Sequence, residues 1–293
     1  MVGINKAALA AVLAFLPLSV PAYAAGPAFP SLEALASLSG PVHISALPEL
    51  PLPARTPWDG FSGEDLFQAL HSALVPTVSP VPSYAQAKTY MFSTAEGRDC
   101  GGAPGILAFY SQVCVAGSGS SGNDYRERGD QNGDGTVDKF MNAEHIWPRG
   151  FSKGALPMAS DLHQLAPTLF TPNGRRANLR FAVVPDPVYS TDSGSRLGSE
   201  GFEPADAVKG NVARAVLYFV VRYYDRDIRN GADYRDFWTA RVPMFLEWNR
   251  ADPPDEAERR RNGLVESFQG NRNPFVDDPS LADRIGPSVF RAH

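Results

Sequence analysis

An excess of positive charge over the whole chain is absent from this sequence. It contains 27 Lys and Arg against 32 Asp and Glu, for a formal net charge of -5. This balance argues against a surface that binds polyanions everywhere, but it allows a local basic groove. Long apolar runs are also missing beyond the N-terminal segment, so no membrane-spanning helix is predicted there. A hydrophobic content of 43% over 293 residues is enough for one large domain or two small ones.

The N-terminal segment has the three parts of a signal peptide. Lys6 supplies the positive charge, residues 7–20 form an apolar run, and residues 22–24 match an A-x-A cleavage site. We therefore expect residues 1–24 to be removed on export, and an uncleaved anchor is the alternative. Residues 25–59 are rich in proline, which forbids a long helix, so they are predicted to form an extension before a domain at 60–293.

Cysteine is scarce, with only Cys100 and Cys114 in the chain. In an exported protein such a pair predicts a disulfide, and two buried free thiols are the alternative. The disulfide would close a loop of about 15 residues and stabilise the fold by roughly 3 kcal/mol. The glycines at 117–122 match G-x-G-x-x-G, but no apolar helix start follows them, which excludes a nucleotide-binding fold.

Oxygen-bearing side chains between residues 130 and 138 follow the spacing of a calcium loop. Glycine stands at position 6, while position 12 is Met141 instead of the usual bidentate Glu. The segment is either a structural calcium site that a distant carboxylate completes, or a polar turn between two strands. The predicted calcium ligands are Asp130, Asn132, Asp134, Thr136 (through its carbonyl) and Asp138.

Residues 141–180 carry the densest set of functional side chains. Their pattern predicts a strand at 139–146 ending in Glu144-His145, a loop, and a second strand at 161–166. A helix follows, with Thr171 as its cap and Pro172 in its first position. A long helix with one buried stripe is predicted at 206–224, followed by helices near 237–249 and 254–268. The predicted fold class is α+β, one mostly helical domain.

The side chains of this stretch suit phosphodiester hydrolysis. His145 has the intrinsic pKa of a general base, about 6.5. Glu144 and Asn173 offer two hard oxygens, and magnesium held by few protein ligands keeps positions open for water and phosphate. Arg149, Arg175 and other arginines of the stretch can bind phosphates of the nucleic acid.

Three ordered motifs stand in this stretch: Asn142-x-Glu144-His145-x-x-Pro148, then Ser160-Asp161-Leu162-His163-x-Leu165-x-Pro167, then Asn173-x-x-Arg176-x-Asn178-x-x-Phe181. They resemble the motifs of the bacterial secreted endonuclease I family, within the ββα-metal (His-Me finger) nucleases. The likeness continues through residues 202–214 and 269–277 and spans roughly residues 60–286. It implies an α+β domain built around a ββα-metal motif.

The resemblance also implies roles for single residues. His145 would be the general base, Glu144 and Asn173 the ligands of Mg²⁺ (or Mn²⁺ or Ca²⁺), and Arg176 a catalytic phosphate contact. Asn178 is either a further ligand or a loop anchor, and His163 would support the site from behind the ligands. Because the loop after Glu144-His145 is short and lacks cysteine here, the transition-state arginine is not assigned. The nucleic-acid contacts predicted beside the site are Arg149, Arg175 and Arg180.

Two functions are compatible with these features. The first is a secreted or periplasmic, sequence-nonspecific endonuclease that hydrolyses DNA, and in many relatives RNA, leaving 5′-phosphate ends. The second is a calcium-stabilised extracellular module that binds nucleic acid or has a structural role, without catalysis. For both we expect a monomer that has no membrane attachment after its signal peptide is removed.

Overall fold

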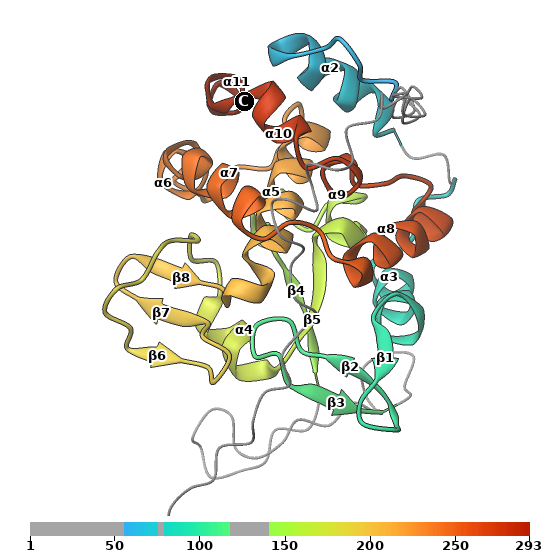
Figure 1. Cartoon of the computed structure of the whole chain (residues 1–293), viewed down its shortest axis with the longest axis vertical. Coiled ribbons are helices and arrows are strands. Elements are labelled where there is room, and N and C mark those ends of the chain that lie inside the picture. The colour runs from blue at the N-terminus through green and yellow to red at the C-terminus, as the bar shows by residue number, and fades with distance from the viewer. Residues whose placement is uncertain (1–55, 76–78, 118–140) are drawn as a thin grey trace, which may run out of the picture. The chain divides into compact units, whose positions relative to one another are not determined.

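Helices and three small antiparallel sheets alternate along the chain in a computed structural model (Figure 1). The structure describes residues 56–75, 79–117 and 141–293, which belong to one compact unit spanning Arg55–His293. The predicted signal peptide, most of the proline-rich extension and the predicted calcium loop therefore lie outside the described residues. About half of the described residues are helical, so the α+β class is confirmed, with less helix than predicted.

The N-terminal part of the unit consists of two helices and a small sheet. Helix α2 spans Gly63–Ala73 and α3 spans Tyr84–Tyr90, where Ser83 and Gln86 form a capping box. A single π-helical turn, Met91–Ala95, follows α3 directly. The sheet has the order β1-β2-β3, with strands Gly97–Asp99, Pro104–Leu107 and Cys114–Ala116.

The predicted disulfide between Cys100 and Cys114 is present at the edge of this sheet. Their Cα atoms are 5.6 Å apart, within the usual range for a disulfide. The bond ties the residue after β1 to the first residue of β3, across the intervening strand β2. It therefore staples a three-stranded sheet that is too short to be stable by itself.

A two-stranded hairpin lies at the centre of the unit and carries the motif residues (Figure 1). Strand β4 (Asn142–His145) pairs antiparallel with β5 (Leu165–Thr168), with His145 opposite Leu165. The second strand begins later than predicted, because Asp161 accepts a hydrogen bond from the His163 amide and starts a 3-10 turn at Leu162–Gln164. Helix α4 follows β5 directly.

Helix α4 spans Phe170–Arg176, and it begins one residue before the predicted cap. Thr171 lies inside its first turn with a buried, unpaired hydroxyl, so the prediction that Thr171 caps the helix is wrong. A third sheet follows, with the order β6-β7-β8 and strands Tyr189–Ser190, Arg196–Gly198 and Gly201–Glu203.

The C-terminal half of the unit is helical. Helix α5, Lys209–Tyr223, is buried over 13 of its 15 residues, so the predicted single buried stripe was too narrow. Pro243 stands in the first turn of α7, where its missing N–H costs no hydrogen bond. The remaining helices are α6 (Tyr234–Phe237), α7 (Val242–Ala251), α8 (Glu256–Gln269), α9 (Pro274–Asp277), α10 (Leu281–Ile285) and α11 (Pro287–Ala292).

Two apolar clusters hold the hairpin in place. The larger contains the buried side of α2, α5, α7, α10 and α11, together with Ile146 and Trp147, which follow β4. The smaller joins α3 and the first sheet to Leu165, the first residue of β5, and to Leu162 and Leu169 on either side of that strand. One cluster packs against the residues that follow β4, and the other packs against β5. The strand that carries Glu144 and His145 is therefore held in place by both clusters.

Candidate active site

The carboxylate of Glu144 is the most constrained group of the site. The residue is 2% exposed, and its Oε1 accepts hydrogen bonds from Tyr110 Oη and Arg176 Nη1, both at 2.8 Å. Burial raises the pKa of Glu144 above its ordinary value, while Arg176 acts in the opposite direction. Both side-chain bonds end on Oε1, which leaves Oε2 as the oxygen for a further ligand.

Arg176, the predicted phosphate contact, is completely buried. Besides its ion pair with Glu144, its guanidinium donates to the carbonyl oxygens of His145 and Ile146, at 2.8 and 2.6 Å. Its plane also lies over the ring of Phe181, with Cζ 4.5 Å from the ring centroid. In this arrangement the guanidinium ties helix α4 to the end of strand β4, and no part of it faces solvent.

Only one ring nitrogen of His145, Nε2, takes part in the hydrogen bond that orients the imidazole. Nε2 lies 3.0 Å from the carbonyl oxygen of Ala159, an acceptor, so Nε2 carries the proton in the neutral ring. The pKa of His145 is lowered to about 4, mainly by burial; Arg149 and Arg176 act in the same direction, and the Ala159 hydrogen bond opposes them. The imidazole is therefore neutral at pH 7, with an unprotonated Nδ1 that can accept a proton.

Helix α4 and strand β4 meet through two parallel side-chain contacts. Asn173 Nδ2 donates to Asn142 Oδ1 at 2.7 Å, and Arg176, three residues on, binds Glu144, two residues beyond Asn142. Residues two apart on a strand share a face, and residues three apart on a helix share a face. This geometry brings Asn173 and Glu144 to the same α4–β4 junction. The hydrogen bond to Asn142 uses Asn173 Nδ2 and does not involve Asn173 Oδ1.

The oxygens at this junction suit a hard divalent cation. One carboxylate oxygen and one amide oxygen make a site of few protein ligands, and magnesium commonly binds in that way, keeping several waters. No cluster of three or more His, Cys, Asp or Glu side chains that could hold a metal occurs among the described residues. A metal here would therefore depend on Glu144 and Asn173.

The remaining predicted residues lie around this junction or apart from it. Asn178 and Arg175 are exposed, and the guanidinium of Arg175 lies over the ring of Tyr189, at 5.5 Å. Arg180 forms an ion pair with Asp236, at 3.0 Å. Arg149 is exposed at the start of the loop after β4 and lies over the ring of Tyr84.

His163 belongs to a separate buried network. Its Nε2 lies 2.9 Å from the carbonyl oxygen of Asn271, and its ring packs edge-on against Tyr218. The neighbouring Asp161 carboxylate accepts hydrogen bonds from Tyr218, Tyr223, Arg222 and Gln269. This network joins the turn before β5 to helix α5 and to the residues after α8, so it supports the hairpin from the side of the core.

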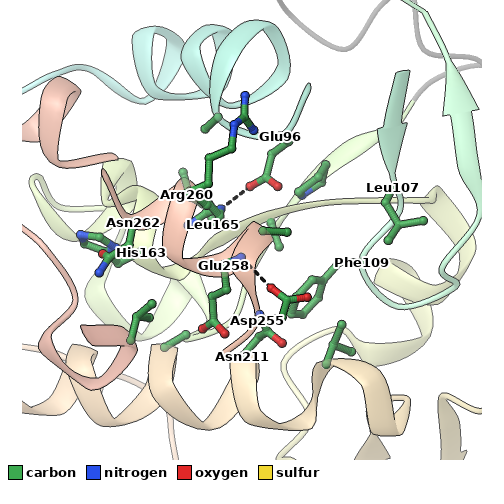
Figure 2. Close-up of a pocket in the computed structure, with 18 of the residues that line it drawn as sticks. Glu96, Leu107, Phe109, His163, Leu165, Asn211, Asp255, Glu258, Arg260 and Asn262 are labelled. Carbon is green, nitrogen blue, oxygen red and sulfur yellow. Dashed lines mark hydrogen bonds and ion pairs between the residues drawn. The ribbon is translucent and has the colours of Figure 1, made fainter. Parts of the chain in front are cut away.

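A cavity of about 340 Å³ lies between helix α8, helix α5 and the first sheet (Figure 2). Glu96, labelled in Figure 2, lines the cavity and forms an ion pair with Arg261. Glu258, also labelled there, forms an ion pair with Arg214. Neither Glu144, His145 nor Asn173 lines this space. The cavity is thus distinct from the α4–β4 junction, and several of its charges are paired.

Comparison with known proteins decides the family. The model of the family described as Endonuclease I matches residues 66–280. The chain belongs to the endonuclease I family. This match includes the strand β4, the hairpin loop and the helix α4 described above.

Several proteins named as ribonucleases or deoxyribonucleases are similar to this endonuclease I chain. It is 36% identical to an extracellular ribonuclease of Bacillus subtilis over 159 residues, 50% of this chain and 54% of that protein. It is 31% identical to an extracellular ribonuclease of Bacillus amyloliquefaciens over 237 residues, 77% and 75% of the two chains. A periplasmic deoxyribonuclease of Aeromonas hydrophila is 32% identical over 124 residues, 41% and 48% of the two chains.

The chain thus spans about half the length of two of these relatives and three quarters of the third. The names of these relatives describe them as extracellular or periplasmic, which confirms the prediction of a secreted or periplasmic protein. Among the described residues, none of the helices has the length and apolar character needed to cross a membrane.

Two aromatic residues that complete the site were not singled out from the sequence, and Asn142 was quoted there only as part of a motif, without a role. Tyr84 comes from helix α3, Tyr110 lies between β2 and β3 of the first sheet, and Asn142 begins β4. The aromatic residues are 34 or more positions away from Glu144, and only the packing of the first sheet and α3 on the hairpin brings them there. A role for Asn142 at the site could have been inferred, because it precedes Glu144 by two residues and so shares its face of the strand.

Proposed function

We propose that this protein is a secreted endonuclease that hydrolyses phosphodiester bonds of nucleic acid without sequence preference, using a divalent metal ion. One observation carries the proposal. The neutral imidazole of His145 follows Glu144 in strand β4, and the Glu144 carboxylate lies at the same α4–β4 junction as the side-chain amide of Asn173. The order of strand, strand and helix around these groups (β4, β5 and α4) supports the proposal of a ββα-metal motif. Magnesium is the proposed ion, with manganese or calcium as substitutes.

The imidazole of His145 acts as the general base. Its Nε2–H is held by the Ala159 carbonyl, so Nδ1 accepts a proton from the attacking water. The water oxygen forms a bond to phosphorus while the bond from phosphorus to the 3′-oxygen breaks. The bonding pair leaves with the 3′-oxygen, which takes a proton from solvent, and the product carries a 5′-phosphate.

Glu144 and Asn173 would hold the metal ion through one oxygen each. When bound, such an ion stabilises negative charge on the phosphate and on the leaving oxygen. Arg176 keeps Glu144 oriented for this role, and its burial makes it a positioning residue. Asn178 is exposed at the end of α4, so we propose it as an anchor for substrate or loop instead of a metal ligand.

We propose that both DNA and RNA are substrates, because the similar proteins include ribonucleases and a deoxyribonuclease. Phosphate contacts by exposed arginines such as Arg149 and Arg175 would not distinguish the two. A monomer is sufficient for this chemistry, because the described part of a single chain supplies all the groups named above. The segment at 130–138 stays a prediction of a structural calcium site.

Replacement of His145 by alanine tests the proposal. We expect cleavage of supercoiled plasmid and of a structureless RNA to fall by about 10²–10⁴-fold, the usual contribution of a general base. EDTA should abolish wild-type cleavage, and added magnesium should restore it. Circular dichroism and thermal unfolding would show that His145→Ala is folded.

Either of two results would contradict the nuclease assignment. One is wild-type protein that binds nucleic acid tightly and cleaves neither substrate with any divalent ion, as a calcium-stabilised binding module would. The other is a folded His145→Ala protein with wild-type activity, which would remove the imidazole from the mechanism. Purification of both proteins in parallel, with the same assay blanks, excludes a contaminating nuclease.

A further inference from the structure

The loop that follows strand β4 presents an arginine that has no acidic partner among the residues the structure describes. Arg149 begins a 3-10 turn, Arg149–Ser152, and its side chain is exposed. No described residue forms an ion pair or a hydrogen bond with its guanidinium. The other cations of the stretch, Arg175 excepted, are neutralised: Lys153 pairs with Asp227 at 2.7 Å, Arg176 with Glu144 at 2.8 Å and Arg180 with Asp236 at 3.0 Å.

This unpaired guanidinium is nevertheless held in one place. Its Cζ lies 5.2 Å from the centroid of the Tyr84 ring, within the range of a cation–π contact. On another side lies Gly154, at φ +69°, where an added Cβ would come within 3.3 Å of Arg149 Nε and Nη2. A main-chain hydrogen bond from Gly154 N to Arg149 O, at 3.0 Å, closes the loop beneath it. The Tyr84 ring and the close approach of Gly154 therefore position a guanidinium that no described acidic residue neutralises.

The ring that supports Arg149 also contacts the general base. The centroids of the Tyr84 and His145 rings are 5.2 Å apart, with the planes inclined at 41°. Lys88, one turn along α3, lies 5.1 Å from the same ring. Tyr84 thus connects the imidazole to two cations that reach the site from different parts of the chain, α3 and the loop after β4.

We infer that Arg149 is the cation that binds the non-bridging oxygens of the scissile phosphate, and that Tyr84 is the positioning residue that aims it. The inference rests on the proposed nuclease function and assigns the charge-stabilising role that buried Arg176 does not fill. A planar guanidinium can donate two parallel hydrogen bonds to a phosphate, and it stacks on a ring while doing so. Replacement of Arg149 by lysine would remove both the pair of parallel hydrogen bonds and the stacking on the ring.

Steady-state cleavage of a short labelled duplex by a set of variants tests this assignment. Arg149→Ala should lower kcat by about 10²–10³-fold, as loss of a preorganised charge-stabilising donor does, with a much smaller change in KM. Arg149→Lys should recover only part of kcat. Arg291→Ala removes an exposed arginine of helix α11, far along the chain, and serves as the matched control for loss of one charge.

The positioning role of Tyr84 has its own signature. Tyr84→Phe keeps the ring and should retain nearly all activity, while Tyr84→Leu should lower kcat and leave KM almost unchanged. In the Arg149→Ala background the Tyr84→Leu change should add little, because both remove the same interaction. Free guanidinium ion, at concentrations far below those that unfold proteins, should partly restore Arg149→Ala, with sodium chloride of equal strength as the blank.

The outcomes separate failure of the inference from failure of the proposed function. If the wild type and Arg291→Ala cleave the duplex and Arg149→Ala is as fast as they are, Arg149 is not the charge-stabilising group. An effect of Arg149→Ala on KM alone would reduce it to a general phosphate contact and also overturn the inference. Equal losses in Tyr84→Phe and Tyr84→Leu would show that the hydroxyl, not the ring, matters. A wild type that cleaves nothing would instead refute the nuclease proposal.

Discussion

A single buried arginine, Arg176, illustrates how the structure changes the role that a sequence motif suggests. Its guanidinium serves three oxygen acceptors at the end of β4, namely Glu144 Oε1 and the carbonyl oxygens of His145 and Ile146. A charge at full burial is stabilised only by such partners. Removal of the arginine would leave the Glu144 carboxylate in the interior with Tyr110 as its other hydrogen-bond donor.

We therefore expect Arg176→Met to lower the free energy of unfolding by about 3–5 kcal/mol, as loss of one partner of a buried pair does. The double variant Glu144→Gln, Arg176→Met should recover a large part of this stability, because the uncompensated carboxylate is gone. Urea unfolding followed by circular dichroism measures both. A phosphate-binding Arg176 would behave differently, with Arg176→Met inactive but as stable as the wild type.

The candidate catalytic residues could be named from the sequence, and their protonation could not. The adjacent Glu144 and His145 and the later Asn173 suggested a metal-dependent nuclease site because their order and spacing can be read along the chain. The neutral form of His145 depends on burial, and its tautomer depends on the Ala159 carbonyl, fourteen residues away. Burial of Arg176 depends on Phe181, Tyr110 and the hairpin, which no local pattern encodes.

At the scale of an element, helix α5 tests how tightly the core must pack. Gly210 lies in its first turn, its amide donates to Asp252 Oδ2 at 2.9 Å, and the carbonyl oxygen of Asp252 lies where a Cβ would stand. The guanidinium of Arg214 is also within 2.9 Å of that position. Helix α5 therefore approaches the end of α7 more closely than any side chain at residue 210 would allow.

Gly210→Ala should consequently destabilise the protein, by about 1–3 kcal/mol, since overpacking must displace a backbone carbonyl. The matched control is Gly263→Ala in the middle of α8, where the nearest atom to an added Cβ is Arg272 Nη1 at 3.6 Å. That change should stabilise the helix by about 0.5–1 kcal/mol. Thermal unfolding of the two variants distinguishes them by sign, and a stabilised Gly210→Ala would mean that the α5–α7 contact is looser than described.

Elements were predicted best where one pattern dominates and worst where side chains compete with the backbone. The start of α7 follows from Pro243, and α8 begins after Asp255, which accepts a hydrogen bond from the Glu258 amide. The alternation at 161–166 suggested a strand, but Asp161 caps a 3-10 turn instead. Its carboxylate is anchored by Tyr218 and Arg222 of α5, so tertiary contacts decided the local structure.

At the scale of the whole molecule, acid stability reflects a histidine that folds in its neutral form. His163 lies beside Asp161, Arg222 and Arg261, and burial lowers its pKa to about 4 from an ordinary value of 6.5. A folded-state pKa below the unfolded one means that the unfolded chain binds the proton more readily. The stability that depends on neutral His163 is therefore complete above pH 6.5 and is lost as the pH falls towards 4.

Acidification of the wild type from pH 6.5 to 4 should lower the free energy of unfolding by up to about 3 kcal/mol from His163 alone. His145 adds to the loss in the same direction, because burial lowers its pKa to about 4 as well. In His163→Gln an amide can still donate to the Asn271 carbonyl but does not titrate, so unfolding free energy should depend less steeply on pH in this range. Urea unfolding at half-unit pH steps gives the two slopes, and the difference at pH 7.5 isolates the packing cost of the substitution. Parallel slopes for the two proteins would mean that His163 is charged in the fold, with Asp161 outweighing its burial.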